Sequence, residues 1–224
     1  MNDTLKQIND IKNLMERSSR FLSLSGLSGV AAGLSALIGA AVAFFYLNYD
    51  IRYFNIEQYF ADKLYSGDTN SLIFLLLDGF LVLFVALSSA AFFTIRKTKK
   101  SGEKLWNSAS KRLLIQLFIP LITGGIFCLL LIFHGIIFIV APATLIFYGL
   151  ALLNAGKYTL NEIQWLGIME IILGLFSTLF IGYGLVFWSI GFGVLHIIYG
   201  ITMYIRYDRN SSSSHSVCRR RISC

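Results

Sequence analysis

The chain has 224 residues, of which 56% are hydrophobic and only 14% are charged, and its formal net charge is +7. A water-soluble fold needs roughly a quarter of its residues charged to cover its surface. The composition therefore excludes a soluble globular domain. It also excludes a disordered chain, which would contain few apolar residues.

Six apolar segments are each long enough, at about 20 residues, to cross the hydrocarbon core of a bilayer. The stretch from Leu113 to Leu153 contains no charged residue and suits two helices joined by a turn at His134 and Gly135. We therefore predict an all-α, polytopic integral membrane protein with a bundle of six transmembrane helices over residues 20–205. The predicted spans are residues 20–47, 71–95, 113–133, 136–153, 162–181 and 185–205.

Two segments flank the predicted bundle. In residues 1–19, apolar side chains recur at near-helical spacing between charged ones, which predicts an amphipathic helix on the cytoplasmic face. This helix either leads into the first span or docks a partner protein. Residues 206–224 combine a serine run with an arginine triplet and are predicted to form a disordered cytoplasmic tail.

Lys and Arg residues concentrate on one side of the predicted bundle. Of the 19 in the chain, all except Arg52 and Lys63 lie at the N-terminus up to residue 20, in the loops after the second and fourth spans, or in the tail. Because basic loops remain in the cytoplasm, we predict that both termini are cytoplasmic in the inner membrane of a bacterial-type cell. The basic side then contacts anionic lipid head groups, and the net charge does not indicate binding to nucleic acid.

Small residues recur on the first predicted span, where Gly29 and Gly33 form a GxxxG pattern. Such a stripe lets two helix backbones approach closely. The helix that packs on it belongs either to the same chain or to a second molecule. The pattern thus predicts helix packing, with an internal contact, a homo-oligomer and a membrane-protein partner all left open.

Three ionisable residues fall well inside predicted spans: Asp78, Glu170 and His196. Inserting such a group into a bilayer costs at least about 2.5 kcal/mol. Each is therefore a candidate functional residue. Gln116, in the third span, and His134, at a hairpin tip, are secondary polar candidates.

Glu170 and His196 lie at matching depths in two spans that are joined by a short turn. Each is about nine residues from the basic end of its span, which corresponds to a depth of about 13 Å and to a position near the midplane. We therefore predict that the acid and the imidazole meet, directly or through water, in a cavity lined by glycines. The small residues on the same helix faces are Gly167, Gly174 and Ser177 beside Glu170, and Gly193 beside His196.

A carboxylate and an imidazole held together away from water share one proton, which suits a proton relay or a proton-coupled solute site. The same contact is also consistent with an interhelical hydrogen bond that only fixes helix register. Two functions follow. One is a small proton- or solute-handling transporter or channel-like protein, and the other is a non-transporting membrane subunit that holds partner proteins through small-residue helix faces.

Catalytic signatures are missing from the sequence. It contains no HExxH, no GxSxG, no phosphate-binding Walker loop and no Cys and His cluster with metal-ligand spacing. We therefore expect no metal or cofactor, and enzymatic activity is the least favoured class. An enzyme acting on lipid would need Asp78 and His134 to converge at the head-group level.

Overall fold

The computed structural model describes residues 25–47, 69–101 and 106–208. Every secondary-structure element within these ranges is helical. The predictions for residues 1–19 and for the tail beyond residue 208 lie outside the described residues. In chain order the elements are α2 (Gly26–Leu47), α4 (Thr69–Ser101), α5 (Ser108–Phe133), η1 (Ile137–Ile139), α6 (Val140–Gly156), α7 (Asn161–Leu179), α8 (Gly184–Trp188), η2 (Ser189–Leu195), α9 (His196–Met203) and η3 (Tyr204–Asp208).

Six helical segments in the described part of the chain are long and apolar enough to cross a membrane, as the sequence predicts. They follow the order of the predicted spans, and the two short hairpins turn at glycines. Gly135 and Gly182 have φ angles of 75° and 105°, which glycine adopts without steric cost.

α4 and α5 are both longer than the sequence predicts. α4 ends at Ser101 rather than at residue 95, so its last turns carry basic residues. α5 begins at Ser108 rather than at residue 113 because Asn107 caps it. The Asn107 side chain accepts a hydrogen bond from the backbone N–H of Ser110 at 2.7 Å, and the Asn107 backbone N–H donates to Ser110 Oγ at 3.0 Å. Hydropathy marks only the apolar part of each helix.

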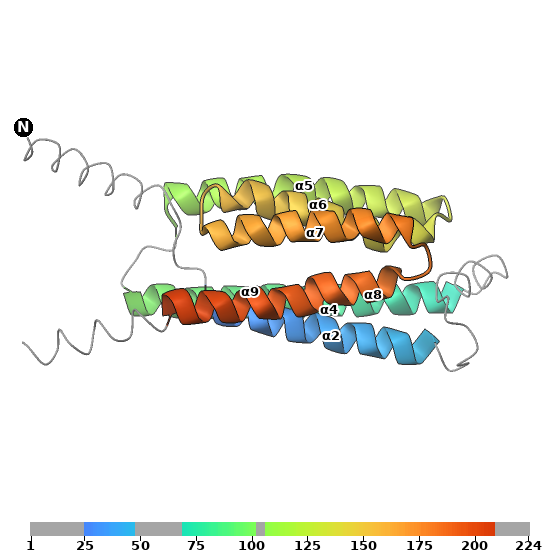
Figure 1. Ribbon diagram of the computed structural model, residues 1–224, viewed down its shortest axis with the longest axis horizontal. Helices are drawn as coiled ribbons and strands as arrows, with labels where there is room; N and C mark the ends of the chain where they lie inside the picture. Colours follow the sequence, from blue (N-terminus) through green and yellow to red (C-terminus); the bar gives the residue numbers. More distant parts are fainter. Residues whose placement is uncertain (1–24, 48–68, 102–105, 209–224) are drawn as a thin grey trace, which may run out of the picture.

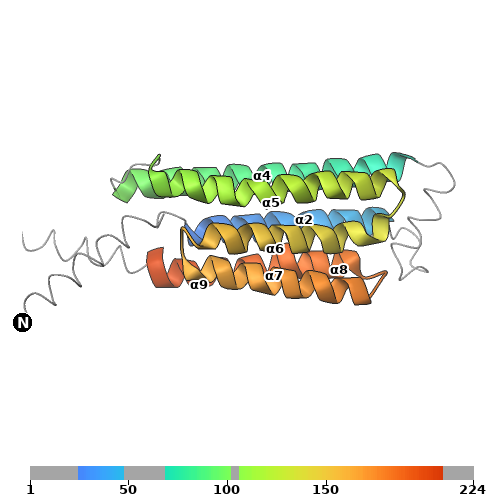
Figure 2. The same ribbon diagram turned by 90° about the horizontal axis from the view of Figure 1, so that it is seen from above.

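The helices form two layers. One layer contains α5, α6 and α7, and the other contains α2, α4 and the segment from α8 to α9 (Figure 1). Within the layers, α6 packs between α5 and α7, and α2 packs between α4 and α9 (Figure 2). The short connection from α7 to α8 crosses between the layers, so α7 lies against the last span.

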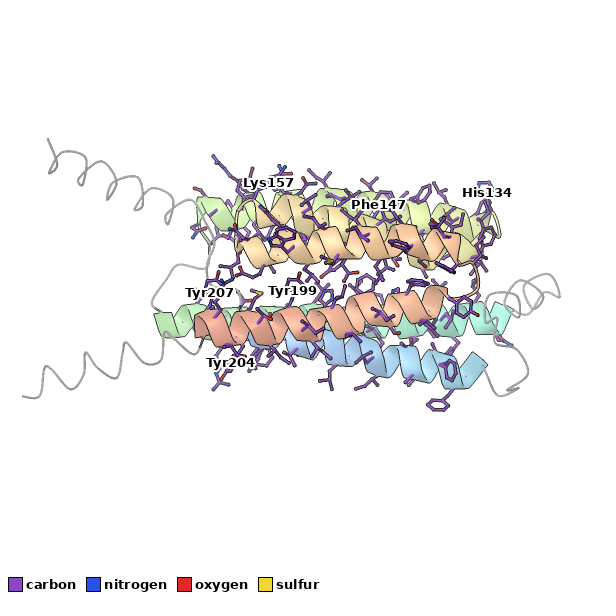
Figure 3. All side chains as sticks on the ribbon, in the orientation of Figure 1. His134, Phe147, Lys157, Tyr199, Tyr204 and Tyr207 are labelled. Carbon is purple, nitrogen blue, oxygen red and sulfur yellow. The ribbon has the colours of Figure 1, made fainter. Side chains whose placement is uncertain are left out.

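The described segments that carry clusters of basic residues gather at one end of the bundle, which we call the basic end. Lys157 lies at this end, and His134 lies at the opposite end (Figure 3). This arrangement keeps the basic segments together, as a single cytoplasmic side requires. The segments at the basic end are the end of α4, the start of α5, the connection from α6 to α7, and η3 (Figure 1).

The last span, which the sequence predicts as one helix, is not regular. η2 is a π-helical segment between α8 and α9, and η3 is a second one after α9. The helix therefore continues to Asp208, into the segment predicted as a disordered tail. Single π-helical turns are wider than α-helical turns and occur frequently at functional sites.

The small-residue stripe of α2 packs inside the chain. A Cβ atom added at Gly29 would lie 3.1 Å from the Cα atom of Gly200, and one added at Gly33 would lie 2.6 Å from the carbonyl oxygen of Gly193. A Cβ atom does not fit at 2.6 Å, and it fits at 3.1 Å only if the neighbouring atoms shift by a few tenths of an ångström. The absence of Cβ atoms therefore lets α2 approach the last span closely. Gly29 and Gly33 thus make an internal helix contact.

Candidate functional site

Glu170 of α7 and His196 of α9 lie opposite each other, about halfway along α7 and between the two layers. The Oε1 atom of Glu170 is 3.4 Å from the Nδ1 atom of His196. The two residues are 0% and 6% exposed, respectively. The structure thus brings together the acid and the imidazole that share a predicted depth.

The hydrogen bonds of His196 define which ring nitrogen carries a proton. Nδ1 lies 3.0 Å from the carbonyl oxygen of Gly191, which can only accept, so Nδ1 must be the donor. Nε2 lies 2.8 Å from the hydroxyl oxygen of Tyr148 on α6. In the neutral imidazole, Nε2 therefore accepts the hydrogen bond that Tyr148 O–H donates, and both ring nitrogens are satisfied.

Aromatic rings cover one side of His196. Phe192, one turn earlier in η2, stacks on the imidazole with a centroid distance of 5.9 Å and lies 4.9 Å from the ring of Tyr148. Trp188 extends the cluster, 5.0 Å from Phe192. The imidazole is thus held between apolar surface and two hydrogen bonds, which restricts its rotation.

Glu170 has no hydrogen bond to either of its carboxyl oxygens. Its surroundings are closely packed, since a Cβ atom added at Gly191 would overlap Glu170 Oε2 and the side chain of Leu145. Leu173 completes this apolar wall. A buried polar group without a partner is costly, and a buried charge is more so. The arrangement therefore suits a neutral carboxyl group better than a charged one.

The glycines of the two predicted stripes pack helices rather than surround the pair. A Cβ atom added at Gly167 or Gly174 would meet α6, and one added at Gly193 would meet Leu37 of α2. The glycine beside Glu170 is instead Gly191, which sequence reasoning missed. Close packing at Gly191 thus takes the place of the predicted glycine-lined cavity.

Ser177 lies two helical turns beyond Glu170, on the side away from the basic end. Its side chain is buried, and its Oγ atom has no hydrogen-bond partner. The spacing corresponds to about 10 Å along α7. Ser177 is therefore a second buried polar group on the same helix, too far from His196 to belong to the pair.

The secondary polar residues lie elsewhere in the bundle. Asp78 on α4 faces α2, because a Cβ atom added at Gly39 would be 3.3 Å from an Asp78 carboxyl oxygen. His134 is exposed at the tip of the α5–α6 hairpin (Figure 3), and Gln116 is in the first half of α5. Asp78 and His134 thus belong to different layers, which does not favour the lipid-acting enzyme.

A second polar cluster, which sequence reasoning also missed, joins α7 to η3 at the basic end. Glu162 Oε1 accepts a hydrogen bond from Arg206 at 2.6 Å, and the Tyr207 hydroxyl lies 3.0 Å from both Glu162 carboxyl oxygens. A cavity of about 520 Å³, which we call the basic-end cavity, opens beside this cluster. Its lining residues are Asn161, Glu162, Trp165, Tyr199, Arg206 and Tyr207.

No protein-family model, curated protein or solved structure matches the chain, so the function is inferred from the geometry of the site. Across residues 25–47, 69–101 and 106–208, no three His, Cys, Asp or Glu side chains are placed to hold a metal ion. The chemistry that this site offers is that of three protonatable side chains in a row, in which His196 contacts both Glu170 and Tyr148.

Proposed function

We propose that this chain is a multi-pass membrane protein that takes up protons at Glu170 and His196 and passes them on. One observation carries the proposal: a fully buried carboxyl group without a hydrogen bond lies 3.4 Å from an imidazole nitrogen. Ionisable side chains inside membrane helices are expensive to insert, and proton relays in pumps and transporters are built from them.

The outer surface of the bundle supports its placement in a bilayer. Large apolar side chains are exposed on both layers, for example Phe80 and Phe84 on α4 and Ile119 and Ile122 on α5. Water-soluble proteins rarely expose contiguous apolar surface of this kind. The basic end faces the cytoplasm of an inner membrane in this proposal, since Lys and Arg favour that side and its anionic head groups.

Glu170 is the proton-binding group. An ionised carboxylate at this position would be buried without a hydrogen-bond donor, so the resting state carries a proton on Glu170. His196 is a basic neighbour within 4 Å, and it can compensate a negative charge on Glu170 by becoming imidazolium. The charge of one residue is thus coupled to that of the other.

His196 connects Glu170 with Tyr148 through its two ring nitrogens. A proton that arrives at Nε2 along the Tyr148 hydrogen bond converts the ring to imidazolium. After Glu170 has released its resting proton, it accepts the Nδ1 proton, so that the Nδ1–H bond breaks and an Oε1–H bond forms. One proton enters the ring at Nε2 and one leaves from Nδ1, so the imidazole is neutral again but carries its proton on Nε2. A rotation of the ring restores the Nδ1–H form that donates to Gly191 before the next transfer.

The close packing favours a proton over a larger substrate. The wall around Glu170 leaves no room even for a methyl group at Gly191. Binding pockets for small molecules typically measure about 300–1,000 Å³. A proton needs only a series of groups that donate and accept hydrogen bonds, which Tyr148, His196 and Glu170 supply.

Proton uptake by proteoliposomes containing a pH-sensitive dye tests the proposal. Glu170→Gln keeps the shape of the side chain and removes its ionisable group. We expect protein-dependent proton flux to fall about 100-fold, the scale on which a positioned proton-transfer group contributes. Asp78→Asn is the matched control, an acid-to-amide change in another span, and it should retain the flux. Equal fluxes for the wild type and Glu170→Gln would rule out the proposal.

The second candidate function is a non-transporting membrane subunit in which the pair fixes helix register. The low exposure of Glu170 and His196 favours it, since both are shielded on all sides. In that case wild-type vesicles take up protons no faster than protein-free vesicles. Glu170→Gln then changes the free energy of unfolding by only about 0.6–2 kcal/mol, as for other interhelical contacts.

A further inference from the structure

Between the basic-end cavity and Glu170, α7 and the last span present matching faces. Four-residue steps along α7 place Glu162, Leu166 and Glu170 on one face. Across from them, Arg206 contacts Glu162 and His196 contacts Glu170. The interface between α7 and the last span therefore has a polar contact at each end, and apolar side chains lie between the two contacts.

That middle layer is apolar and closed. Leu166 and Met203 are 4% and 5% exposed. They belong to one buried cluster, against which both Tyr199 and Tyr148 pack. Because Tyr199 also lines the cavity and Tyr148 also holds His196, the cluster lies directly between the two polar sites. Its remaining buried members are Leu152, Leu160 and Ile163.

The cavity on the near side of this layer is open to the surface. Trp165 and Arg206 line it and are exposed, with 67% of the Arg206 side chain accessible. Tyr199 and Tyr207 point into the region between the two layers (Figure 3). The step from Glu162 to Glu170 corresponds to about 12 Å along α7. A single layer of apolar side chains therefore separates the cavity from the carboxyl group.

We propose that protons reach Glu170 from the basic-end cavity, and that Leu166 and Met203 form the hydrophobic layer that controls the access of water to it. The proposal rests on the proposed function of Glu170. Apolar constrictions exclude water and act as gates in channels. A small separation of α7 from α9 admits water past this layer, while the Glu162–Arg206 contact holds α7 to η3 at the cavity.

Thiol labelling measures this access without depending on proton transfer. The three native cysteines, Cys128, Cys218 and Cys224, are changed to serine, and Glu170→Cys supplies the one reactive thiol. The probe is 2-aminoethyl methanethiosulfonate, a small water-soluble cation, and modification of the detergent-solubilised full chain is followed by mass spectrometry. Adding Leu166→Ser is expected to speed labelling about tenfold, equivalent to about 1.4 kcal/mol off the barrier.

Leu175→Ser is the matched control, because it is the same change on the same helix, at a side chain that is 54% exposed on the outside of the bundle. It should leave the labelling rate unchanged. Met203→Ser repeats the test from α9, so a folding defect of Leu166→Ser does not decide the outcome. Labelling that is equally accelerated by Leu175→Ser, or that is accelerated by neither Leu166→Ser nor Met203→Ser, would overturn the proposed access route.

The two proposals fail in different ways. If labelling behaves as expected but Glu170→Gln leaves proton flux intact, the route exists and the relay does not. If Glu170→Gln abolishes the flux but labelling does not respond to Leu166 or Met203, the relay is supported and protons reach it from another direction.

Discussion

α7 carries two carboxyl groups that face the last span, and their surroundings are opposite in kind. Glu162, at the basic end, accepts hydrogen bonds from Arg206 and Tyr207 beside a cavity of about 520 Å³. Glu170, eight residues later, accepts none and is completely buried. The same side chain on one helix thus meets a cation and a hydroxyl at one position, and apolar groups with an imidazole at the other.

The difference shows how neighbouring groups decide what a carboxyl group can do. Glu162 has a guanidinium donor, so its ionised form is stabilised by charge-assisted hydrogen bonds and anchors α7 to η3. Glu170 lacks such donors, so its ionised form depends on a positive charge on His196. An acid that is fixed in one charge state serves as an anchor, whereas an acid coupled to an imidazole can exchange a proton.

We expect the largest difference between Glu162 and Glu170 in the infrared spectrum. A protonated carboxyl group has an infrared carbonyl-stretch band that an ionised carboxylate lacks. We expect the wild-type protein at neutral pH to show this band for Glu170 and not for Glu162, since only Glu162 has an ionic partner. Glu170→Gln should remove the part of the band that comes from Glu170, and Glu162→Gln should leave the band unchanged. A band of undiminished intensity in Glu170→Gln would exclude Glu170 as a protonated group.

The next effect concerns the packing that keeps Glu170 without donors. Gly191→Ala places a Cβ atom onto Glu170 Oε2 and Leu145, so we expect it to lower the free energy of unfolding by about 1–3 kcal/mol, as overpacked cores do. Gly79→Ala on α4 is the control, because its added Cβ meets nothing within 4 Å. Unfolding in mixed detergent micelles, followed by circular dichroism, measures both.

Alanine favours a helix over glycine by up to about 1 kcal/mol, so Gly79→Ala should be neutral or stabilising. If Gly191→Ala also leaves the free energy of unfolding unchanged, the side chains around Glu170 move to accommodate the added methyl group. Packing then does not keep hydrogen-bond donors away from the acid. The pair of variants therefore separates a rigid dry site from one that adapts.

The contact between Glu170 and His196 was predictable because an antiparallel hairpin with a short turn has few possible registers. Counting residues from the basic end of each helix places both side chains at one depth. The same counting places Arg206 near Glu162, but both lie at the ends of predicted spans, where hydropathy does not distinguish a helix residue from a loop residue.

The groups around the pair were not predictable from the same pattern. Tyr148 belongs to α6, and its direction depends on how α6 rotates when it packs between α5 and α7. Gly191 lies beside Glu170 because η2 is π-helical, and the wider turn shifts which residues face α7. A regular period of about 3.6 residues predicts Gly193 there, whereas in the structure Gly193 packs on α2.

The smallest effect concerns the anchor at the basic end. Glu162→Gln removes the charge that holds Arg206, and we expect it to lower the free energy of unfolding by only about 0.5–1 kcal/mol, since the Arg206 partner is largely exposed to solvent although the Glu162 side chain is 9% exposed. Because 67% of the Arg206 side chain is accessible to solvent, the loss should shrink as ionic strength rises.

Glu170→Gln provides the contrast in the same unfolding measurement. A buried pair is screened far less by salt than an exposed one, so any change in stability caused by Glu170→Gln should be independent of ionic strength. If instead both variants respond to salt alike, then water and ions reach Glu170 as readily as they reach Glu162. The apolar layer of Leu166 and Met203 would then not separate the two acids.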